Sequence, residues 1–342
     1  MQRAVACPDK FRGTLAAADA AAAIASGLVR AGFDDVVTMP LADGGEGTLD
    51  ALLAARGGSR RTARVTGPLG DPVDAEWGVL SNGIAVVEMA RASGLALVGA
   101  DNDPLRATTR GTGELIAVAR REGFTRVVVA VGGSATTDGG LGAVEALAWS
   151  LQGIDVTVAC DVSTHYTDAA RVYGPQKGAT DAQVALLTRR LGLLAQQLES
   201  RTGVDITSIE GGGAAGGLAG GLAAIGARLV PGFDVVAEAA QFEAALDGAL
   251  VAVTGEGKVD ATSLEGKVVA GVVDWCEELG VPRVGIVGGQ VTEDARAQLE
   301  SHAGVQVLAL TERVWHEQEA FERAALLLEE AAVEAGRAAL AQ

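Results

Sequence analysis

The segment VGGSATTDGG, residues 131–140, has the composition of a loop that binds an anion. It follows a β-branched run and precedes helical sequence, so backbone N–H groups and the positive end of a helix dipole would face a ligand together. Glycine lets a ligand approach the backbone closely, and serine and threonine add hydroxyl donors. The residues concerned are Gly132, Gly133, Ser134, Thr136 and Thr137. The segment predicts a phosphate site; the plain alternative is a glycine-rich turn capped by hydroxyls.

This segment is not a standard phosphate loop. The pattern G-x-x-x-x-G-K-[ST] is absent, since both Gly-Lys pairs, at 257–258 and 266–267, are followed by valine. The dinucleotide pattern G-x-G-x-x-G is absent as well, which disfavours an NAD-linked dehydrogenase. A kinase with this sequence would need a phosphate loop of another type.

The segment TGEGKVD, residues 254–260, combines acids, a lysine and two glycines at the end of an apolar run. Carboxylates are suitable ligands for Mg²⁺, and lysine neutralises phosphate oxygens. We predict Glu256 and Asp260 as metal ligands, and Asp260 and the nearby Lys267 as catalytic residues. The alternative is a solvated charged loop. The glycines favour a functional loop, because a loop that only solvates charges does not need them.

Two more strand ends carry polar residues. The segment PDKFRG, residues 8–13, holds Lys10 and Arg12, and a planar guanidinium suits a carboxylate ligand. The segment PLADGGEGT, residues 40–48, holds Asp43, which can bind a metal or a substrate hydroxyl, or cap the helix that follows. The alternative for the first segment is an ordinary surface loop.

Asp161 follows an apolar strand in the sequence VACDV. A carboxylate against apolar neighbours should have a raised pKa, which is useful in a general base. A plain aspartate at a strand end is the alternative. The adjacent Cys160 has no histidine placed by the sequence to activate it, and we interpret it as a core residue.

These segments fall where short apolar runs end, and the runs alternate with helical sequence. Such alternation is typical of parallel strands buried on both faces, and ligands of such sheets bind at the carboxyl ends of the strands. Helices are expected at Leu15–Arg30, Gly113–Glu122, Leu141–Leu151, Lys267–Leu279 and Glu317–Ala339.

The stretch from Arg61 to Glu88 differs, because alternating runs are separated by Pro/Gly and Asn-Gly signals that indicate a meander. We predict an α/β fold with a Rossmann- or flavodoxin-like parallel-sheet domain, residues 1–61 plus 246–342. A second, mixed α/β domain, residues 62–245, is expected as an insertion, with the active site in the cleft between the domains.

Composition excludes several classes of protein. The formal net charge of −17 over 342 residues disfavours partners such as nucleic acid or an anionic membrane, and an anionic substrate would need local positive groups. Three scattered cysteines and three histidines form neither a disulfide framework nor a zinc spacing, so a reducing cytoplasmic location is expected. The oligomeric state stays open, with a homodimer as one alternative.

Taken together, the motifs resemble those of the bacterial glycerate kinases of the glyoxylate and galactarate pathways. Eleven collinear motifs over about the first 290 residues carry the resemblance: PDKFRGT (8–14), PLADGGEGT (40–48), TGPLG (66–70), EMARASGL (88–95), TTRGTGELI (108–116), GGSATTDGG (132–140), CDV (160–162), YGPQKGA (173–179), GAAGGL (213–218), TGEGKVD (254–260) and EGK (265–267).

The resemblance implies an ATP-dependent kinase that phosphorylates D-glycerate with Mg²⁺, usually to 2-phosphoglycerate. Within EMARASGL it adds Ser93 to the predicted substrate ligands Lys10, Arg12 and Asp43. The sequence departs from the family pattern after Asp161, where Ser163-Thr164-His165 replaces Asn-Pro-Leu, and at Thr137, where the family has asparagine. Alternatives are a kinase for another small hydroxy acid and a non-catalytic protein that binds glycerate or nucleotide.

Overall fold

The computed structural model describes residues 2–264 and 267–341, which form two compact units. Unit 1 consists of the two ends of the chain with a short segment, residues 2–43, 50–55 and 236–341. Unit 2 consists of residues 44–49 and 56–235. Each unit contains one sheet with helices, so the predicted α/β class, with one parallel and one mixed sheet, is confirmed.

The sheet of unit 1 has five strands in the order β2-β1-β9-β10-β11, and each pairing is parallel. The strands are β1 (Arg3–Ala6), β2 (Asp35–Thr38), β9 (Ala249–Val259), β10 (Val284–Val291) and β11 (Val305–Ala309). The chain leaves β1 toward β2 on one side, and β9 adds on the other. The junction of β1 and β9 is therefore the point where the strand order reverses, at which ligands bind in open α/β sheets.

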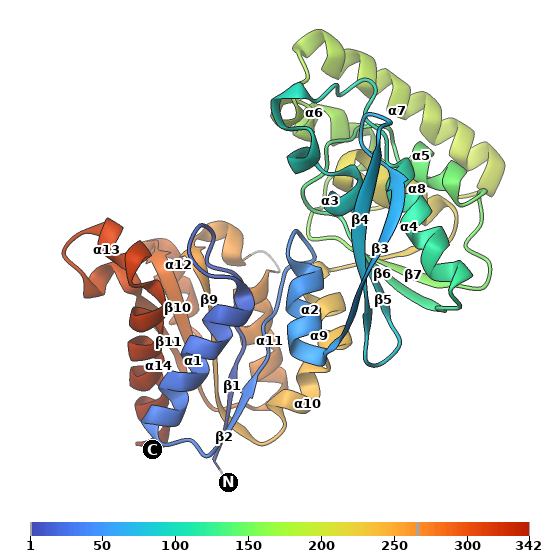
Figure 1. Cartoon of the computed structure of the whole chain (residues 1–342). Helices are drawn as coiled ribbons and strands as arrows, with labels where there is room; N and C mark the ends of the chain where they lie inside the picture. Colours follow the sequence, from blue (N-terminus) through green and yellow to red (C-terminus); the bar gives the residue numbers. More distant parts are fainter. Residues whose placement is uncertain (1, 265–266, 342) are drawn as a thin grey trace. The chain divides into compact units, whose positions relative to one another are not determined.

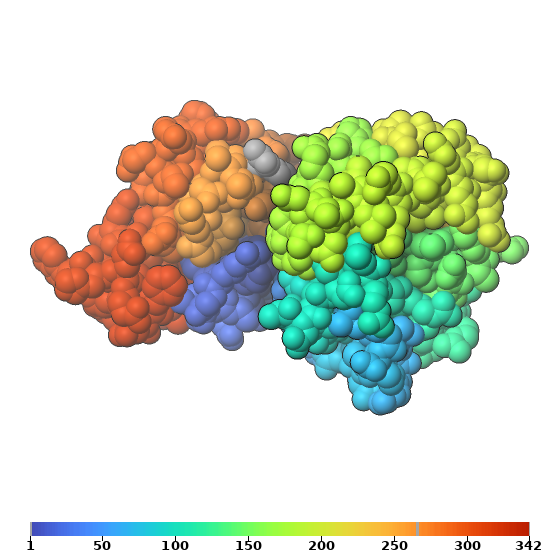
Figure 2. All heavy atoms as spheres, turned by 90° about the horizontal axis from the view of Figure 1, so that it is seen from above, coloured from blue at the N-terminus to red at the C-terminus, as the bar shows by residue number. Residues whose placement is uncertain are grey.

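Helices cover both faces of this sheet (Figure 1). One face carries α1 (Ala17–Ala31) and α14 (Ala324–Leu340), and the other α10 (Phe242–Leu246) and α11 (Val268–Leu279). Helices α1 and α14 pack closely at Gly27, where a Cβ atom would lie 2.3 Å from the carbonyl oxygen of Glu329. In Figure 2 the blue atoms of the N-terminal part lie beside orange atoms of the C-terminal part, which come before α14 in the chain. Short helices α12 (Glu293–Leu299) and α13 (Glu317–Glu322) complete the unit.

Two expectations for unit 1 are corrected. Residues 254–259 form the last part of β9 rather than a loop, because β10 pairs with them as far as Val259 and Val291. Paired backbone overrides the low strand propensity of glycine here. The helix expected at 317–339 is interrupted at Arg323, which separates α13 from α14.

The sheet of unit 2 has six strands in the order β3-β4-β5-β6-β7-β8. Strands β3 (Gly58–Thr66), β4 (Pro72–Leu80) and β5 (Ala85–Glu88) form the expected antiparallel meander. Strands β6 (Arg126–Ala130), β7 (Asp155–Ala159) and β8 (Arg228–Val230) extend it in parallel from β5.

The helices of unit 2 surround a core centred on the buried faces of β5, β6 and β7. The longer ones are α4 (Arg110–Arg121), α7 (Asp181–Thr202) and α8 (Ala214–Ala224), and the shorter ones are α3 (Ala90–Ser93), α5 (Leu141–Ala146), α6 (Ala169–Tyr173) and α9 (Gly232–Ala240), which runs into unit 1. Helix α2 (Thr48–Arg56) is likewise divided between the two units. Helix α5 ends five residues before the predicted end at Leu151. Among the described residues, none of the helices combines the length and apolar character that a membrane crossing requires.

Candidate active site

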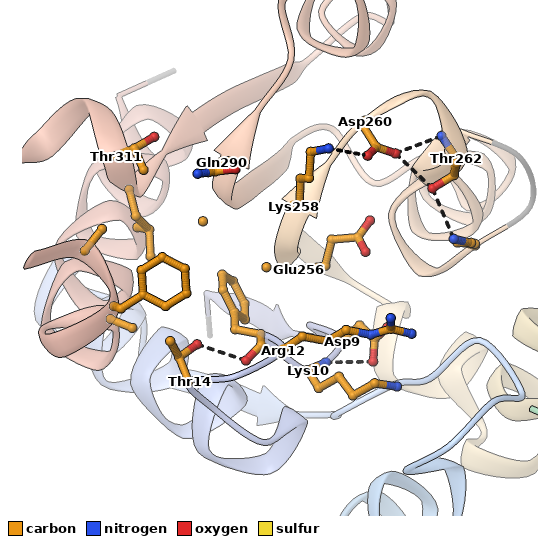
Figure 3. A pocket seen from close by; sticks show the side chains of 18 of the residues that line it. Asp9, Lys10, Arg12, Thr14, Glu256, Lys258, Asp260, Thr262, Gln290 and Thr311 are labelled. Atoms are coloured by element: carbon orange, nitrogen blue, oxygen red, sulfur yellow. Dashed lines mark hydrogen bonds and ion pairs between the residues drawn. The ribbon is translucent and has the colours of Figure 1, made fainter. Parts of the chain in front are cut away.

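A pocket of about 390 Å³ opens at the carboxyl edge of the parallel sheet in unit 1 (Figure 3). Segments at the carboxyl ends of all five strands line it, with residues of α13 and α14. This is the position at which parallel sheets bind ligands. The pocket brings together these predicted site residues: Lys10, Arg12, Asp43, Glu256, Asp260 and Lys267.

Asp9 lies at this edge of the sheet, in the segment that follows β1, and was not predicted as a site residue. It is 7% exposed, its N–H donates to the carbonyl of Gly255, and its Oδ1 accepts the N–H of Lys10 at 2.6 Å. Burial raises the pKa of Asp9 to about 7; the carboxylates of Asp43 and Glu256 add to this, while Lys10 opposes it. The signal in the sequence was its place directly after β1, beside the two cations that we did single out.

Glu256 is the second buried acid of the pocket, on β9. Burial raises its pKa above the ordinary range, with smaller opposing contributions from Ser263 and Lys267. Its Oε1 atom is buried and has no hydrogen-bond partner among the described residues. An unpartnered buried carboxylate oxygen is costly, and a hard cation would satisfy it. The residues present therefore fit Mg²⁺ at Glu256, although within the described part of the chain no three acidic, histidine or cysteine side chains are arranged as a metal cluster.

Asp260 is arranged differently from Glu256. Its Oδ1 accepts the N–H and the hydroxyl of Thr262 at 3.0 and 2.8 Å, which opens a short 3₁₀ turn, Ala261–Leu264. Its Oδ2 forms an ion pair of 3.1 Å with Lys258. The hydrogen bonds from Thr262 and the contact with Lys258 lower the pKa of Asp260. Asp260 is thus an ionised carboxylate already engaged by protein groups, and its predicted role toward the metal stays a prediction.

The lysines of the chain are concentrated at the predicted sites. The sequence has only four, and three of them, Lys10, Lys258 and Lys267, line the pocket. The Nζ atom of Lys267 lies 3.2 Å from the hydroxyl of Thr262. The preceding residues 265 and 266 of the EGK motif lie outside the described part of the structure. With Arg12, these lysines supply the local positive charge that an anionic ligand of an acidic protein needs.

Glycines in both units allow one backbone segment to pack closely against another. In unit 1, Gly257 lets the backbone of Phe11 and Arg12 lie against β9, where a Cβ atom would be 3.1 Å from the N atom of Arg12. In unit 2, a Cβ atom on Gly132 would be 2.7 Å from the Cα of Gly45. Gly133 has a φ of 72°, in the left-handed region that favours glycine. These glycines thus have packing and conformational reasons independent of any ligand.

The first amides of α5, behind the 132–140 loop, already have partners. The N–H groups of Gly140 and Gly142 donate to the carboxylate of Asp138, and that of Ala143 donates to the hydroxyl of Thr109. These amides are thus not free for a phosphate as the sequence suggested. The Thr136 hydroxyl donates to the carbonyl of Ala215. The Thr137 hydroxyl is buried and has no partner among the described residues, and Ser134 is half-buried.

Lys177, the fourth lysine, was not predicted as a site residue. It is the last residue of the short 3₁₀ turn at 175–177, is 3% exposed, and its Nζ donates to the carbonyl of Thr136 at 2.6 Å. Asn102 bridges the same region, since its side-chain amide donates to the carbonyls of Ala135 and Lys177. The rarity of lysine in this chain, and its place in the YGPQKGA motif, were the available signals.

The remaining predicted residues lie in unit 2. Oδ1 of Asp161 accepts the N–H of Gly232 at 2.5 Å. Ser93 is fully buried, and its hydroxyl accepts that of Thr112 at 2.9 Å. Oε1 of Glu88 accepts the N–H groups of Gly47 and Leu49 at the start of α2, and the role of Asp43 stays a prediction. The roles of Asp161 and Ser93 toward a substrate stay predictions.

A parallel sheet whose strand ends gather buried carboxylates, lysines and an arginine is an arrangement typical of α/β enzymes. The sequence profile described as the glycerate kinase family matches residues 4–152 and 148–340. The chain belongs to this family and is therefore a kinase. The overlap of the two matched segments falls where the chain passes directly from Ala148 toward β7.

Individual relatives agree with this membership. The glycerate 2-kinase of Escherichia coli K12 is 39% identical over 328 residues, which cover 85% of this chain and 86% of that protein. The glycerate kinase of Bacillus subtilis 168 is 37% identical over 366 residues, with 96% and 95% covered. A crystal structure from Salmonella typhimurium LT2, assigned as a glycerate kinase 2, superposes with a TM-score of 0.85 at 32% identity and covers 99% of this chain and 98% of that one.

Proposed function

We propose that the chain transfers the γ-phosphate of ATP to the 2-hydroxyl of D-glycerate, with Mg²⁺, and releases ADP and 2-phosphoglycerate. The observation that carries the proposal is the pocket of unit 1, in which cations and buried acids converge at the strand ends of a glycerate kinase family chain. The 39% identity with a protein named glycerate 2-kinase supports the choice of hydroxyl.

Phosphoryl transfer requires little covalent chemistry from the protein, which mainly positions the reactants and neutralises charge. The hydroxyl oxygen of glycerate forms a bond to the γ-phosphorus, the bond from that phosphorus to the β–γ bridging oxygen breaks, and the hydroxyl proton passes to a carboxylate. When bound, Mg²⁺ supplies charge neutralisation at the phosphates. We assign Glu256 and Asp260 to the metal, Lys267 to the phosphate oxygens, and Asp161 to the proton.

The glycerate carboxylate needs a cation in a protein of net charge −17. We assign Arg12, with Lys10, to this carboxylate, because a guanidinium can bind it with two parallel hydrogen bonds. Asp43 and Ser93 are assigned to the glycerate hydroxyls, and the 132–140 loop to phosphate. Replacing Arg12 by alanine should lower kcat/KM for glycerate about 10- to 100-fold, as expected for one charge-assisted bidentate contact.

The decisive experiment measures both products. Purified protein with ATP, Mg²⁺ and D-glycerate should release ADP. Adding enolase alone should then convert the second product to phosphoenolpyruvate, because enolase acts on 2-phosphoglycerate. If phosphoenolpyruvate forms only when a phosphoglycerate mutase is also added, the transferred phosphate is on the 3-hydroxyl.

A panel of acceptors tests the substrate. The segment after Asp161 departs from the family pattern, and Thr164 and Tyr173 in it share a hydrogen bond of 2.8 Å. D-glycerate should exceed L-glycerate, glycolate and lactate as acceptor. A preference for another hydroxy acid would reassign the substrate, and ADP release at background level with all of them would refute the proposed activity.

A further inference from the structure

The pocket of unit 1 has two chemically different ends. Its polar end holds the acids and cations described above. Its other end is apolar, with Phe11 and Leu310 on the sheet side and Phe321 and Ala324 from α13 and α14. In Figure 3 the labelled Thr311 and Gln290 lie toward one side, and Lys10, Arg12 and Asp260 toward the other.

Glycerate accounts for only the polar end. It is a small anion without an apolar face, whereas a pocket of about 390 Å³ falls in the range that holds ligands of drug size. A ligand that fills both ends must carry a flat or apolar group joined to an anionic one. A nucleoside triphosphate has this composition, and the proposed reaction requires one.

Phe321 is the residue that most needs an explanation at the apolar end. It is 49% exposed although it lines the pocket, and the whole chain has only six phenylalanines. An exposed ring at a pocket wall offers a surface on which a base can stack. Phe11, by contrast, is 2% exposed and held against Gly255, so it forms a fixed wall.

We propose that the apolar end of this pocket is the subsite for the purine base of the nucleotide, with Phe321 covering one face of the base and the phosphates directed toward Lys258 and Lys267. The side chains of Gln290 and Thr311 carry donors and acceptors at this end, which can meet the edge of a base. The inference rests on the proposed function, and it places the base in unit 1.

Equilibrium binding separates the base from the phosphates. The probes are ADP with Mg²⁺ and inorganic tripolyphosphate with Mg²⁺, titrated calorimetrically into the wild-type protein and Phe321→Ala. Loss of the stacking ring should weaken ADP binding about tenfold and leave tripolyphosphate binding unchanged. Leu326→Ala is the matched control, because Leu326 is 44% exposed on the adjacent helix and is not part of the pocket lining.

Turnover gives the second measurement. Phe321→Ala should raise KM for ATP about tenfold with an unchanged KM for D-glycerate. Unchanged ADP binding in Phe321→Ala, or a defect confined to glycerate, overturns the subsite even if the wild type is an active glycerate kinase. Weakened ADP binding without turnover of any acceptor would retain the subsite and reject the proposed function, so the two failures are distinguishable.

Discussion

The Nζ atom of Lys177 donates a hydrogen bond of 2.6 Å to the backbone carbonyl of Thr136, inside the 132–140 loop. Burial lowers the pKa of Lys177 from 10.5 to about 7, and the nearby carboxylate of Asp138 opposes this only in part. A lysine is rarely buried in this way without a reason. Here it ties the 3₁₀ turn of the YGPQKGA motif to a loop that has glycines at both ends.

Lys177→Met should therefore change the pH dependence of stability. Between pH 7 and 10.5 the unfolded lysine is protonated and the folded one is mostly neutral, so this group's contribution to wild-type stability rises with pH. The free energy of unfolding of the variant, minus that of wild type, should therefore be larger near pH 7 than near pH 9, by up to about 1.4 kcal/mol per pH unit. Urea unfolding at both pH values measures the difference, and a difference independent of pH would mean that Lys177 titrates like an exposed lysine.

Gly133→Ala should separate a ligand role of the 132–140 loop from backbone strain. Gly133 has a φ of 72°, and a Cβ atom there would lie 3.2 Å from that of Ala90. Gly123, also in unit 2, has a φ of 90° and no neighbour within 4 Å, so Gly123→Ala is a matched control for the strain. Each variant should lose about 1–2 kcal/mol of stability.

Only Gly133→Ala should raise KM for ATP, if the loop contacts nucleotide phosphates. Steady-state kinetics with ATP varied at saturating D-glycerate tests this. Equal ATP kinetics in the two variants would remove the loop from the nucleotide site and leave it a packing role against Gly45. A defect in glycerate KM alone would instead assign the loop to the acceptor.

The sheets could be predicted from the sequence because their physical signals are local. Runs of β-branched residues gave β6 and β7, and the Pro/Gly and Asn-Gly signals gave the β3–β5 meander. The end of β9 was not predictable in this way, since its pairing with β10 comes from residues about thirty positions later in the chain. The strand propensity of the local sequence carries no information about a pairing with such distant residues.

The site was only partly predictable for a similar reason. Strand-end reasoning found Lys10, Arg12 and Glu256, because carboxyl ends of parallel strands meet at one edge. It missed Asp9, which is distinguished by its burial beside the acids Asp43 and Glu256. That arrangement brings together the ends of three strands that are distant in the sequence. The same reasoning also overestimated the amides at the start of α5. Those of Gly140 and Gly142 pair with Asp138 in the loop itself, and that of Ala143 pairs with Thr109, which lies about thirty residues earlier in the chain.

Asp9→Asn should stabilise the protein more at high pH than at low pH. The folded pKa of about 7 lies above the ordinary 3.8, so between these values the folded state holds a proton that the unfolded state releases. This group's contribution to wild-type stability therefore falls as pH rises to 7. Asparagine keeps an oxygen for the N–H of Lys10 and removes the charge.

Thermal unfolding in EDTA near pH 5 and near pH 8 measures this effect. The increase in the free energy of unfolding that Asp9→Asn gives over wild type should grow with pH by at most about 1.4 kcal/mol per pH unit, up to pH 7. Asp205→Asn is a control whose stability difference from wild type should not change between pH 5 and pH 8: the hydroxyl and N–H of Thr207 lower the pKa of Asp205 below its ordinary 3.8, so the contribution of this carboxylate is lost only in more acidic solution. A constant gain for Asp9→Asn across this range would contradict the raised pKa.

The last prediction separates the base from the metal ligand. A phosphoryl acceptor needs a carboxylate in reach of its hydroxyl, whereas Mg²⁺ needs hard oxygen ligands. Asparagine is a conservative change at both acids, because at position 161 it can still accept the N–H of Gly232 and at position 260 the groups of Thr262. Loss of activity in either variant is then not explained by loss of these bonds.

The measurement is kcat against Mg²⁺ concentration for Asp161→Asn, Asp260→Asn and Glu256→Gln. Asp161→Asn should lose kcat with an unchanged Mg²⁺ midpoint, because it removes only the proton acceptor. The other two should shift the midpoint to higher Mg²⁺; the larger shift is expected for Glu256→Gln, since Oε1 of Glu256 has no hydrogen-bond partner among the described residues and Asp260 already pairs with Lys258. The opposite pattern would exchange the two roles, and near-normal activity in all three variants would place the chemistry on other acids, of which Asp9 is the first to examine.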